Sequence, residues 1–94
     1  MSNQKAGLKQ KILVVDDDKY TRTLLEGIFR GGPAEAQFAC DVAEARKLFA
    51  ATDFNLIIMD QRLPDGNGLD LLREMRAGRS QQVAIRITGY ADVH

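Results

Sequence analysis

Short apolar runs of β-type residues alternate along the chain with stretches whose apolar residues recur at helical spacing. The clearest run, from Ile12 to Val15, is continuously apolar, as expected of a strand that is covered on both faces. The expected strands are 11–15, 36–40, 55–59 and 83–87, and the expected helices are 20–30, 42–51 and 68–76, with a loop at 61–67. This alternation predicts an α/β fold in which crossover helices join the strands of a parallel sheet.

Start and stop signals support the helices. The first helix is expected to bury one stripe of apolar residues: Leu24, Leu25, Ile28 and Phe29. Asp17 or Asp18 is placed to cap its start, and a Gly-Gly-Pro sequence ends it. The second helix follows Asp41, with Glu44 three residues later, which is the spacing of a capping box. The strand at 36–40 is short and only half apolar, which suits the edge of a sheet.

Polar residues with oxygen ligands follow three of the expected strands. Asp16 and Asp17 end the first strand, Asp60 ends the third, and Thr88 follows the fourth. Ligands of open parallel sheets bind in the crevice at the carboxyl ends of the strands. Converging carboxylates repel one another, and a hard divalent cation such as Mg2+ would neutralise them. Mg2+ typically takes one or two carboxylates plus phosphate oxygens, which leaves an aspartate available as a nucleophile toward phosphorus.

Three sequence segments carry a resemblance to a known family. KILVVDDD, IIMD followed by QRLPDGNGLDLL, and AIRIT followed by glycine resemble, in order and spacing, response-regulator receiver domains. The resemblance covers roughly residues 11–90. It implies a doubly wound, flavodoxin-like fold with strand order 2-1-3-4, formed by residues 11–94 after an N-terminal tail of residues 1–10. It also implies a two-component phosphorelay, in which a histidine kinase or a phosphotransfer protein supplies the phosphoryl group and the receiver signals through altered surface contacts.

The same resemblance implies a role for each site residue. Asp60 would be the phosphoacceptor, Asp17 a direct Mg2+ ligand, and Asp16 an acidic partner acting directly or through water. The main-chain carbonyl of Arg62 would complete the protein ligands of the metal, and Thr88 would hydrogen-bond the incoming phosphoryl group.

Residues near the acceptor are expected to shape or cover the site. Pro64, Gly66 and Gly68 would shape the loop after Asp60. The side chains of Arg62 and Tyr90, each two residues beyond a site residue, could lean over the phosphoryl group and limit access of water.

The composition of the chain argues against several classes of function. The chain has 94 residues, with 13 Lys plus Arg against 13 Asp plus Glu, so no overall field favours nucleic acid or an anionic membrane. The single cysteine, Cys40, is expected to be a small buried hydrophobe, and His94 is assigned no function. No apolar run approaches the roughly 18 residues of a membrane span. These features predict a cytoplasmic protein.

The expected elements depart from a complete receiver, which has a fifth strand carrying a lysine and an aromatic residue, and a fifth helix. The chain therefore resembles a receiver that is incomplete at its C-terminus, either a piece of a longer protein or a natural short form. Losing the lysine removes a charge-assisted contact worth roughly 1.5–3 kcal/mol. The fourth strand becomes an edge with apolar Val83, Ile85 and Ile87 on one face, which predicts a homo-dimer or a partner chain that covers it.

Two other function classes remain open at this stage. The first is a receiver-like module that binds a partner, or a second copy, without being phosphorylated. The second is a phosphohydrolase of the haloacid-dehalogenase type, which would use Asp16, Asp18 and Thr88 but leaves the motif around Asp60 unexplained.

Overall fold

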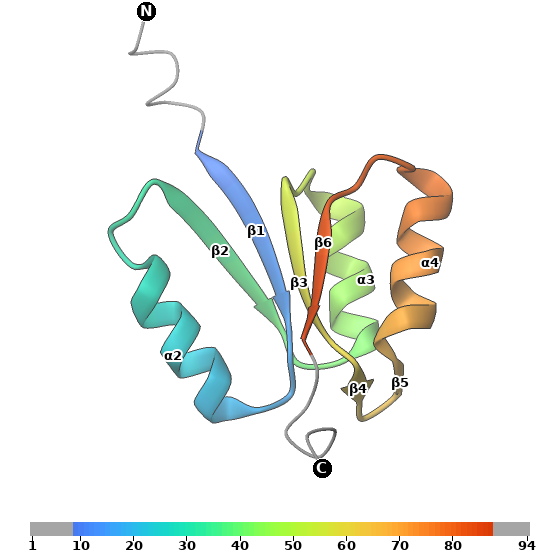
Figure 1. Cartoon of the computed structure of the whole chain (residues 1–94), viewed down its shortest axis with the longest axis horizontal. Helices are drawn as coiled ribbons and strands as arrows, with labels where there is room; N and C mark the ends of the chain where they lie inside the picture. Colours follow the sequence, from blue (N-terminus) through green and yellow to red (C-terminus); the bar gives the residue numbers. More distant parts are fainter. Residues whose placement is uncertain (1–8, 88–94) are drawn as a thin grey trace, which may run out of the picture.

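Strands and helices alternate through residues 9–87, the part of the chain that the computed structural model describes. The elements in chain order are β1 (Gln10–Val15), α2 (Lys19–Phe29), β2 (Ala34–Ala39), α3 (Val42–Ala51), β3 (Leu56–Asp60), β4 (Arg62–Leu63), β5 (Gly66–Asn67), α4 (Gly68–Gly78) and β6 (Ala84–Ile87). The four longer strands form one sheet in the order β2-β1-β3-β6, and every pairing is parallel (Figure 1). The predicted parallel sheet and the predicted strand order are therefore confirmed.

The helices cover the sheet from both sides. Helix α2 lies on one face, and α3 and α4 lie together on the other (Figure 1). Right-handed crossovers explain this, because the chain moves one way along the sheet from β1 to β2 and the opposite way from β2 to β3 and β6. The direction of travel reverses between β1 and β3, which makes their carboxyl ends the switch point of the sheet.

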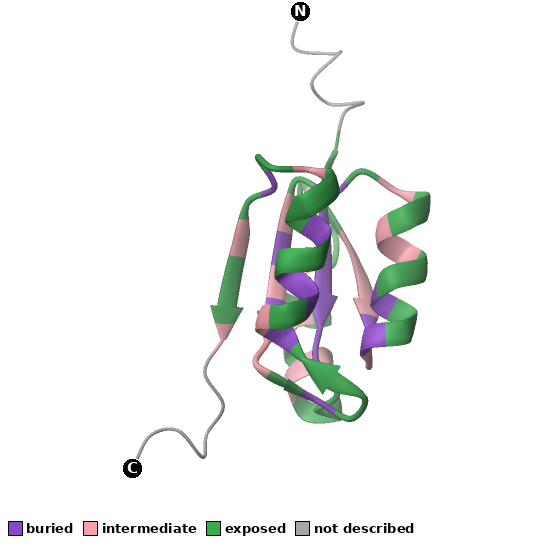
Figure 2. Ribbon diagram, turned by 90° about the vertical axis from the view of Figure 1, so that its right-hand side faces the viewer, coloured by how far each residue is buried: buried purple, intermediate pink, exposed green. Residues whose placement is uncertain are grey.

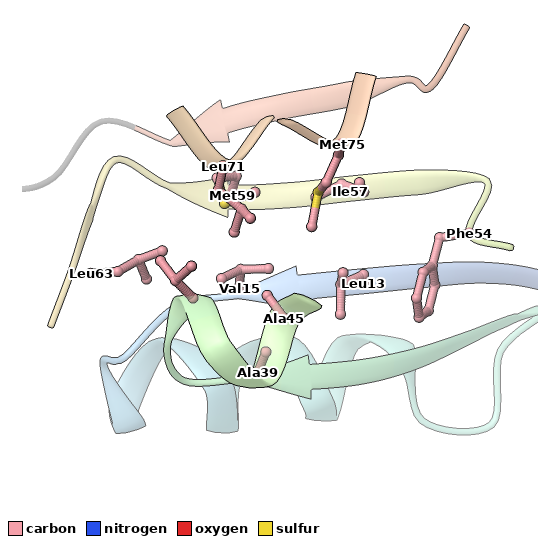
Figure 3. Close-up of a cluster of buried hydrophobic side chains, with 11 residues drawn as sticks. Leu13, Val15, Ala39, Ala45, Phe54, Ile57, Met59, Leu63, Leu71 and Met75 are labelled. Atoms are coloured by element: carbon pink, nitrogen blue, oxygen red, sulfur yellow. The ribbon is translucent and has the colours of Figure 1, made fainter. Parts of the chain in front are cut away.

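The core lies between the sheet and the α3/α4 layer. Eleven buried side chains form one cluster: Leu13, Val15, Ala39, Val42, Ala45, Phe54, Ile57, Met59, Leu63, Leu71 and Met75 (Figure 3). Alternate residues of β1 and β3 point into this cluster, as the pleat of a strand requires. Met59 and Met75 belong to this cluster, where their flexible side chains fill irregular gaps.

The opposite face of the sheet is only partly covered. Helix α2 has no fully buried residue, and within its predicted apolar stripe Leu25 and Phe29 are half-buried while Leu24 and Ile28 are 54% and 63% exposed. Only part of the expected stripe therefore packs against the sheet. Ile85 of β6 is 53% exposed, and no residue of β6 is fully buried (Figure 2).

Two expected segments differ from the structure. The predicted loop at 61–67 contains the antiparallel hairpin of β4 and β5, which pairs Arg62 with Asn67 and Leu63 with Gly66. Pro64 and Asp65 occupy its two-residue turn, a position that suits proline because its φ is already fixed there. Strand β2 begins at Ala34 and ends at Ala39, so the predicted strand at 36–40 was placed too late, because pairing with Gln10 extends it toward Pro33.

The predicted limits of α3 are confirmed, and those of the other elements differ by one or two residues. Strand β3 includes Asp60, which pairs with Ile87, and α4 continues to Gly78. Strand β6 begins at Ala84 rather than at Val83, although the carbonyl of Val83 still accepts a 3.1 Å hydrogen bond from the N–H of Ile57. Helix α2 begins one residue before and ends one residue before its predicted limits.

Candidate functional site

Three carboxylates meet at the switch point of the sheet. One oxygen each of Asp16, Asp17 and Asp60 lies within 4.8 Å of the others. Their proximity follows from the strand register, because Val15 of β1 is the partner of Met59 of β3 and the acids come next on each strand. Asp60 lies 44 positions after Asp16 and 43 positions after Asp17 in the sequence. The structure thus brings the three residues together, as the sequence led us to expect.

Asp16 is the buried member of this acidic cluster, with 5% of its surface exposed. Its N–H donates to the carbonyl of Ala39 at 2.9 Å, which extends the β1–β2 pairing by one residue, and its Oδ1 accepts from the N–H of Asp18 at 2.8 Å. Burial raises the pKa of Asp16; the N–H of Asp18 opposes this, and repulsion from nearby acids, Asp60 first, adds to it. A bound cation would remove that penalty.

Asp18 is separated from the cluster by a structural role. It is the N-cap of α2, where its carboxylate accepts from the N–H of Tyr20 at 3.2 Å and from the hydroxyl of Thr21 at 2.7 Å. The Thr21 hydroxyl is the largest cause of its lowered pKa. Of the two caps that the sequence allowed, Asp18 is therefore the one used, and the Asp16/Asp18 pair of a dehalogenase-type site is not formed.

The β4–β5 hairpin begins with Arg62. Arg62 is exposed, lies two residues after Asp60, and pairs with Asn67 across the hairpin. Asn67 caps α4 by accepting from the N–H groups of Leu69 and Asp70. The hairpin therefore connects the end of β3 directly to the capped start of α4.

Gly68 closes the base of the hairpin against the acceptor strand. Its N–H donates to the carbonyl of Gln61 at 2.8 Å. A Cβ on residue 68 would collide with the carbonyl oxygen of Asp60 and would also crowd the Met59 side chain. The sequence predicted that Gly68 shapes this loop, and the structure supplies the physical reason, which is the close approach of two backbones.

Asp65 was not predicted to have a role. Its two carboxylate oxygens accept from the N–H groups of Val42 and Ala43, at the start of α3, at 2.7 and 3.1 Å. The Pro-Asp-Gly sequence signals a turn, but a contact with a helix that lies more than 20 positions earlier in the chain has no local signal.

Cys40 differs from the prediction of a buried hydrophobe. It is half-buried, and its thiol donates to Oε1 of Glu44 at 3.3 Å. That hydrogen bond is the largest cause of the raised pKa of the thiol. The capping box is also shifted, because Asp41 accepts from the N–H of Glu44 while the Glu44 carboxylate accepts from the N–H of Cys40.

Thr88 and Tyr90, which the sequence placed at the site, and His94 lie outside the described residues.

The donor set fits Mg2+ better than a softer metal. All three grouped ligands are carboxylate oxygens. Asp60 is half-buried and Asp17 is exposed, which leaves room for waters and a phosphate. The residues that could hold the ion are Asp16, Asp17 and Asp60, with the carbonyl of Arg62 nearby in the chain.

A doubly wound parallel sheet with a cluster of carboxylates at its switch point defines a flavodoxin-like domain of the receiver type. The family model that matches the chain is the response regulator receiver domain, and it spans residues 12–94. The chain belongs to this family.

Curated relatives and solved structures agree with this assignment. The chain is 39% identical over 85 residues to the response regulator protein PilR of Pseudomonas aeruginosa. This match covers 90% of the chain and 19% of PilR. The chain is 43% identical over 65 residues to the aerobic respiration control protein ArcA of Escherichia coli K12. This match covers 69% of the chain and 27% of ArcA. The non-phosphorylated HemR receiver domain of Leptospira biflexa superposes with a TM-score of 0.81 at 29% identity, covering 90% of the chain and 68% of that domain.

The chain thus spans about a quarter or less of the length of these curated relatives. Among the described residues, no helix has both the length and the apolar character needed to cross a bilayer. The dehalogenase interpretation is set aside, since the family assignment accounts for the motif around Asp60.

Proposed function

We propose that this receiver domain accepts a phosphoryl group on Asp60 in a Mg2+-dependent reaction, with a histidine kinase or a phosphotransfer protein as donor. The observation that carries the proposal is the convergence of the Asp16, Asp17 and Asp60 carboxylates within 4.8 Å at the ends of two adjacent strands. Asp60 is half-buried, so its carboxylate is reachable by a donor. Phosphorylation would alter the surface around the site, and a partner would read that change.

In the proposed reaction an oxygen of the Asp60 carboxylate bonds to phosphorus while the bond between phosphorus and the donor breaks. When bound, Mg2+ neutralises charge on the phosphoryl oxygens. Asp17 and Asp16 hold the ion together with Asp60 and the main-chain carbonyl of Arg62. Thr88 hydrogen-bonds the phosphoryl group, and the side chains of Arg62 and Tyr90 limit access of water. The MaeR response regulator, 32% identical to this chain with a TM-score of 0.70, has been solved bound to beryllium trifluoride, which motivates that probe here.

The test is labelling by acetyl phosphate in the presence of Mg2+. We expect each chain to form one acyl phosphate and no acid-stable linkage. Asp60→Asn should abolish the labelling. Asp17→Asn should weaken Mg2+ binding, so that more Mg2+ is needed for half-maximal labelling. Asp53→Asn is the matched control, because Asp53 precedes β3 at the opposite end of the sheet and is 93% exposed. Labelling that persists in Asp60→Asn would refute the acceptor assignment. No labelling of the wild type, and no binding of beryllofluoride, would favour the non-phosphorylated interaction module.

We also propose that two copies pair through β6. Within the described residues β6 is an edge strand, with backbone N–H and C=O groups turned away from β3. Ala84 packs against the core on the α3/α4 side, so Ile85 points to the opposite, partly covered face. A two-fold axis perpendicular to the sheet would pair the β6 edges antiparallel and keep that face on the same side in both copies. We place this axis at Ile85, the exposed apolar residue of β6, so that Ile85 of each copy lies beside Ile85 of the other.

A further inference from the structure

The tip of the β4–β5 hairpin is attached to the start of α3 by a charged contact. Asp65 accepts from the N–H of Val42 at 2.7 Å and from the N–H of Ala43 at 3.1 Å. Carboxylates are favoured at this end of a helix, because its free N–H groups and the helix dipole are positive. The N–H of Val42 is the largest cause of the lowered pKa of Asp65, so the carboxylate is ionised at neutral pH.

Two apolar contacts accompany the charged one. Leu63 of β4 is 8% exposed and belongs to the core cluster. Gly66 of β5 lies so close to α3 that a Cβ on it would be 3.0 Å from Cγ2 of Val42. The hairpin tip is therefore seated on the first turn of α3.

The base of the same hairpin is fixed on the acceptor strand. Gly68 lies against the carbonyl of Asp60 and donates to the carbonyl of Gln61. Arg62, whose main-chain carbonyl is the proposed metal ligand, lies between this base and the tip. A segment held at both ends can present a ligand in one position, whereas a segment held only at its base can swing.

We propose that Asp65 is a positioning residue, which holds the β4–β5 hairpin on α3 and so fixes the main-chain carbonyl of Arg62 beside the acidic cluster. The inference rests on the proposed Mg2+ site. Asp65 would not touch the metal or the phosphoryl group, and would act through the hairpin backbone.

The chain offers a matched control at the same helix end. Asp41 accepts from the N–H of Glu44 at 2.8 Å, so α3 is capped by two carboxylates, of which only Asp65 comes from the hairpin. Removing either carboxylate costs the helix a cap of similar kind. Only removal of Asp65 releases the hairpin.

The first experiment measures the Mg2+ concentration that gives half-maximal labelling by acetyl phosphate. We expect Asp65→Ala to raise it roughly tenfold, the scale on which residues supporting metal ligands act, with little change in the maximal rate at saturating Mg2+. Asp65→Asn, which keeps one acceptor oxygen, should restore part of the affinity. Asp41→Ala should leave the half-maximal concentration unchanged. Equal shifts in Asp65→Ala and Asp41→Ala, or no shift in Asp65→Ala, would overturn the proposal.

A second experiment without metal separates this inference from the proposed function. Amide hydrogen exchange of residues 62–67 should become faster in Asp65→Ala and stay unchanged in Asp41→Ala. If the wild type neither binds Mg2+ nor becomes labelled, the proposed function fails, and the exchange data alone decide whether Asp65 holds the hairpin. Unchanged exchange in Asp65→Ala overturns the inference whatever the labelling shows.

Discussion

At the scale of single residues, two glycines of the same helix have opposite surroundings. Gly68 begins α4 in contact with the carbonyl of Asp60, whereas Gly78 ends α4 with nothing within 4 Å of the position that a Cβ would take. The requirement for glycine is therefore local to the site and does not extend along the helix.

This contrast predicts substitutions of opposite sign. Gly68→Ala should lower the free energy of unfolding by about 1–3 kcal/mol, because the new methyl group has to displace backbone rather than a flexible side chain. Gly78→Ala should raise it by up to about 1 kcal/mol, because alanine has the higher helix propensity. Urea unfolding of both variants checks the pair, and a Gly68→Ala protein as stable as the wild type would contradict the close approach.

The sequence was informative about the residues at the ends of strands and silent about contacts between distant segments. Asp16, Asp17 and Asp60 could be grouped because the carboxyl ends of adjacent parallel strands must lie together. The contact of Asp65 with Val42 depends on how segments far apart in the sequence pack, which periodicity does not encode.

At the scale of elements, the order and type of the main strands and helices followed from apolar periodicity, because burial on one or two faces imposes it. The β4–β5 hairpin was missed, since each strand has only two residues and is too short to show any period. The apolar stripe of α2 was identified, but periodicity alone cannot tell which side of a stripe finds a partner. Leu24 lies on the side that does not.

Helices α2 and α4 should respond differently to the loss of a leucine. Leu24→Ala in α2 removes a side chain that is 54% exposed, so we expect the free energy of unfolding to fall by less than about 1 kcal/mol. Leu71→Ala in α4 leaves a cavity beside the core cluster, and we expect a loss of about 2–5 kcal/mol. Denaturant titrations measure both. A loss for Leu24→Ala equal to that for Leu71→Ala would mean that the α2 face is covered in solution.

At the scale of the whole molecule, the two edges of the sheet differ in character. Among the described residues, each edge carries one exposed charge, Glu35 on β2 and Arg86 on β6, but β6 also presents the exposed apolar Ile85. Charged residues at an edge oppose the addition of a further strand, and apolar residues favour it. The dimer proposed above therefore uses β6.

Light scattering at micromolar concentrations should detect that dimer. Ile85→Lys should raise its dissociation constant about 30-fold or more, equivalent to ~2 kcal/mol for a central interface residue, because it places two like charges at the two-fold axis. Glu35→Lys, on the other edge, is the control and should leave the dissociation constant unchanged. A wild-type protein that stays monomeric, or one dissociated equally by both variants, would rule out pairing through β6.

The all-parallel pairing of the central sheet has a consequence for how the chain folds during synthesis. No two neighbouring strands of that sheet are joined by a tight turn. β1, the most deeply buried strand, pairs with β3 across a long stretch of sequence, since the partner of Ile12 is Leu56. Loop closure must therefore precede most of the strand pairing, which slows folding relative to proteins built from hairpins. While β3 is still inside the ribosome, one edge of β1 stays unpaired and apolar. Nascent chains in which β1 has emerged from the ribosome and β3 has not are then the species that a chaperone would recognise.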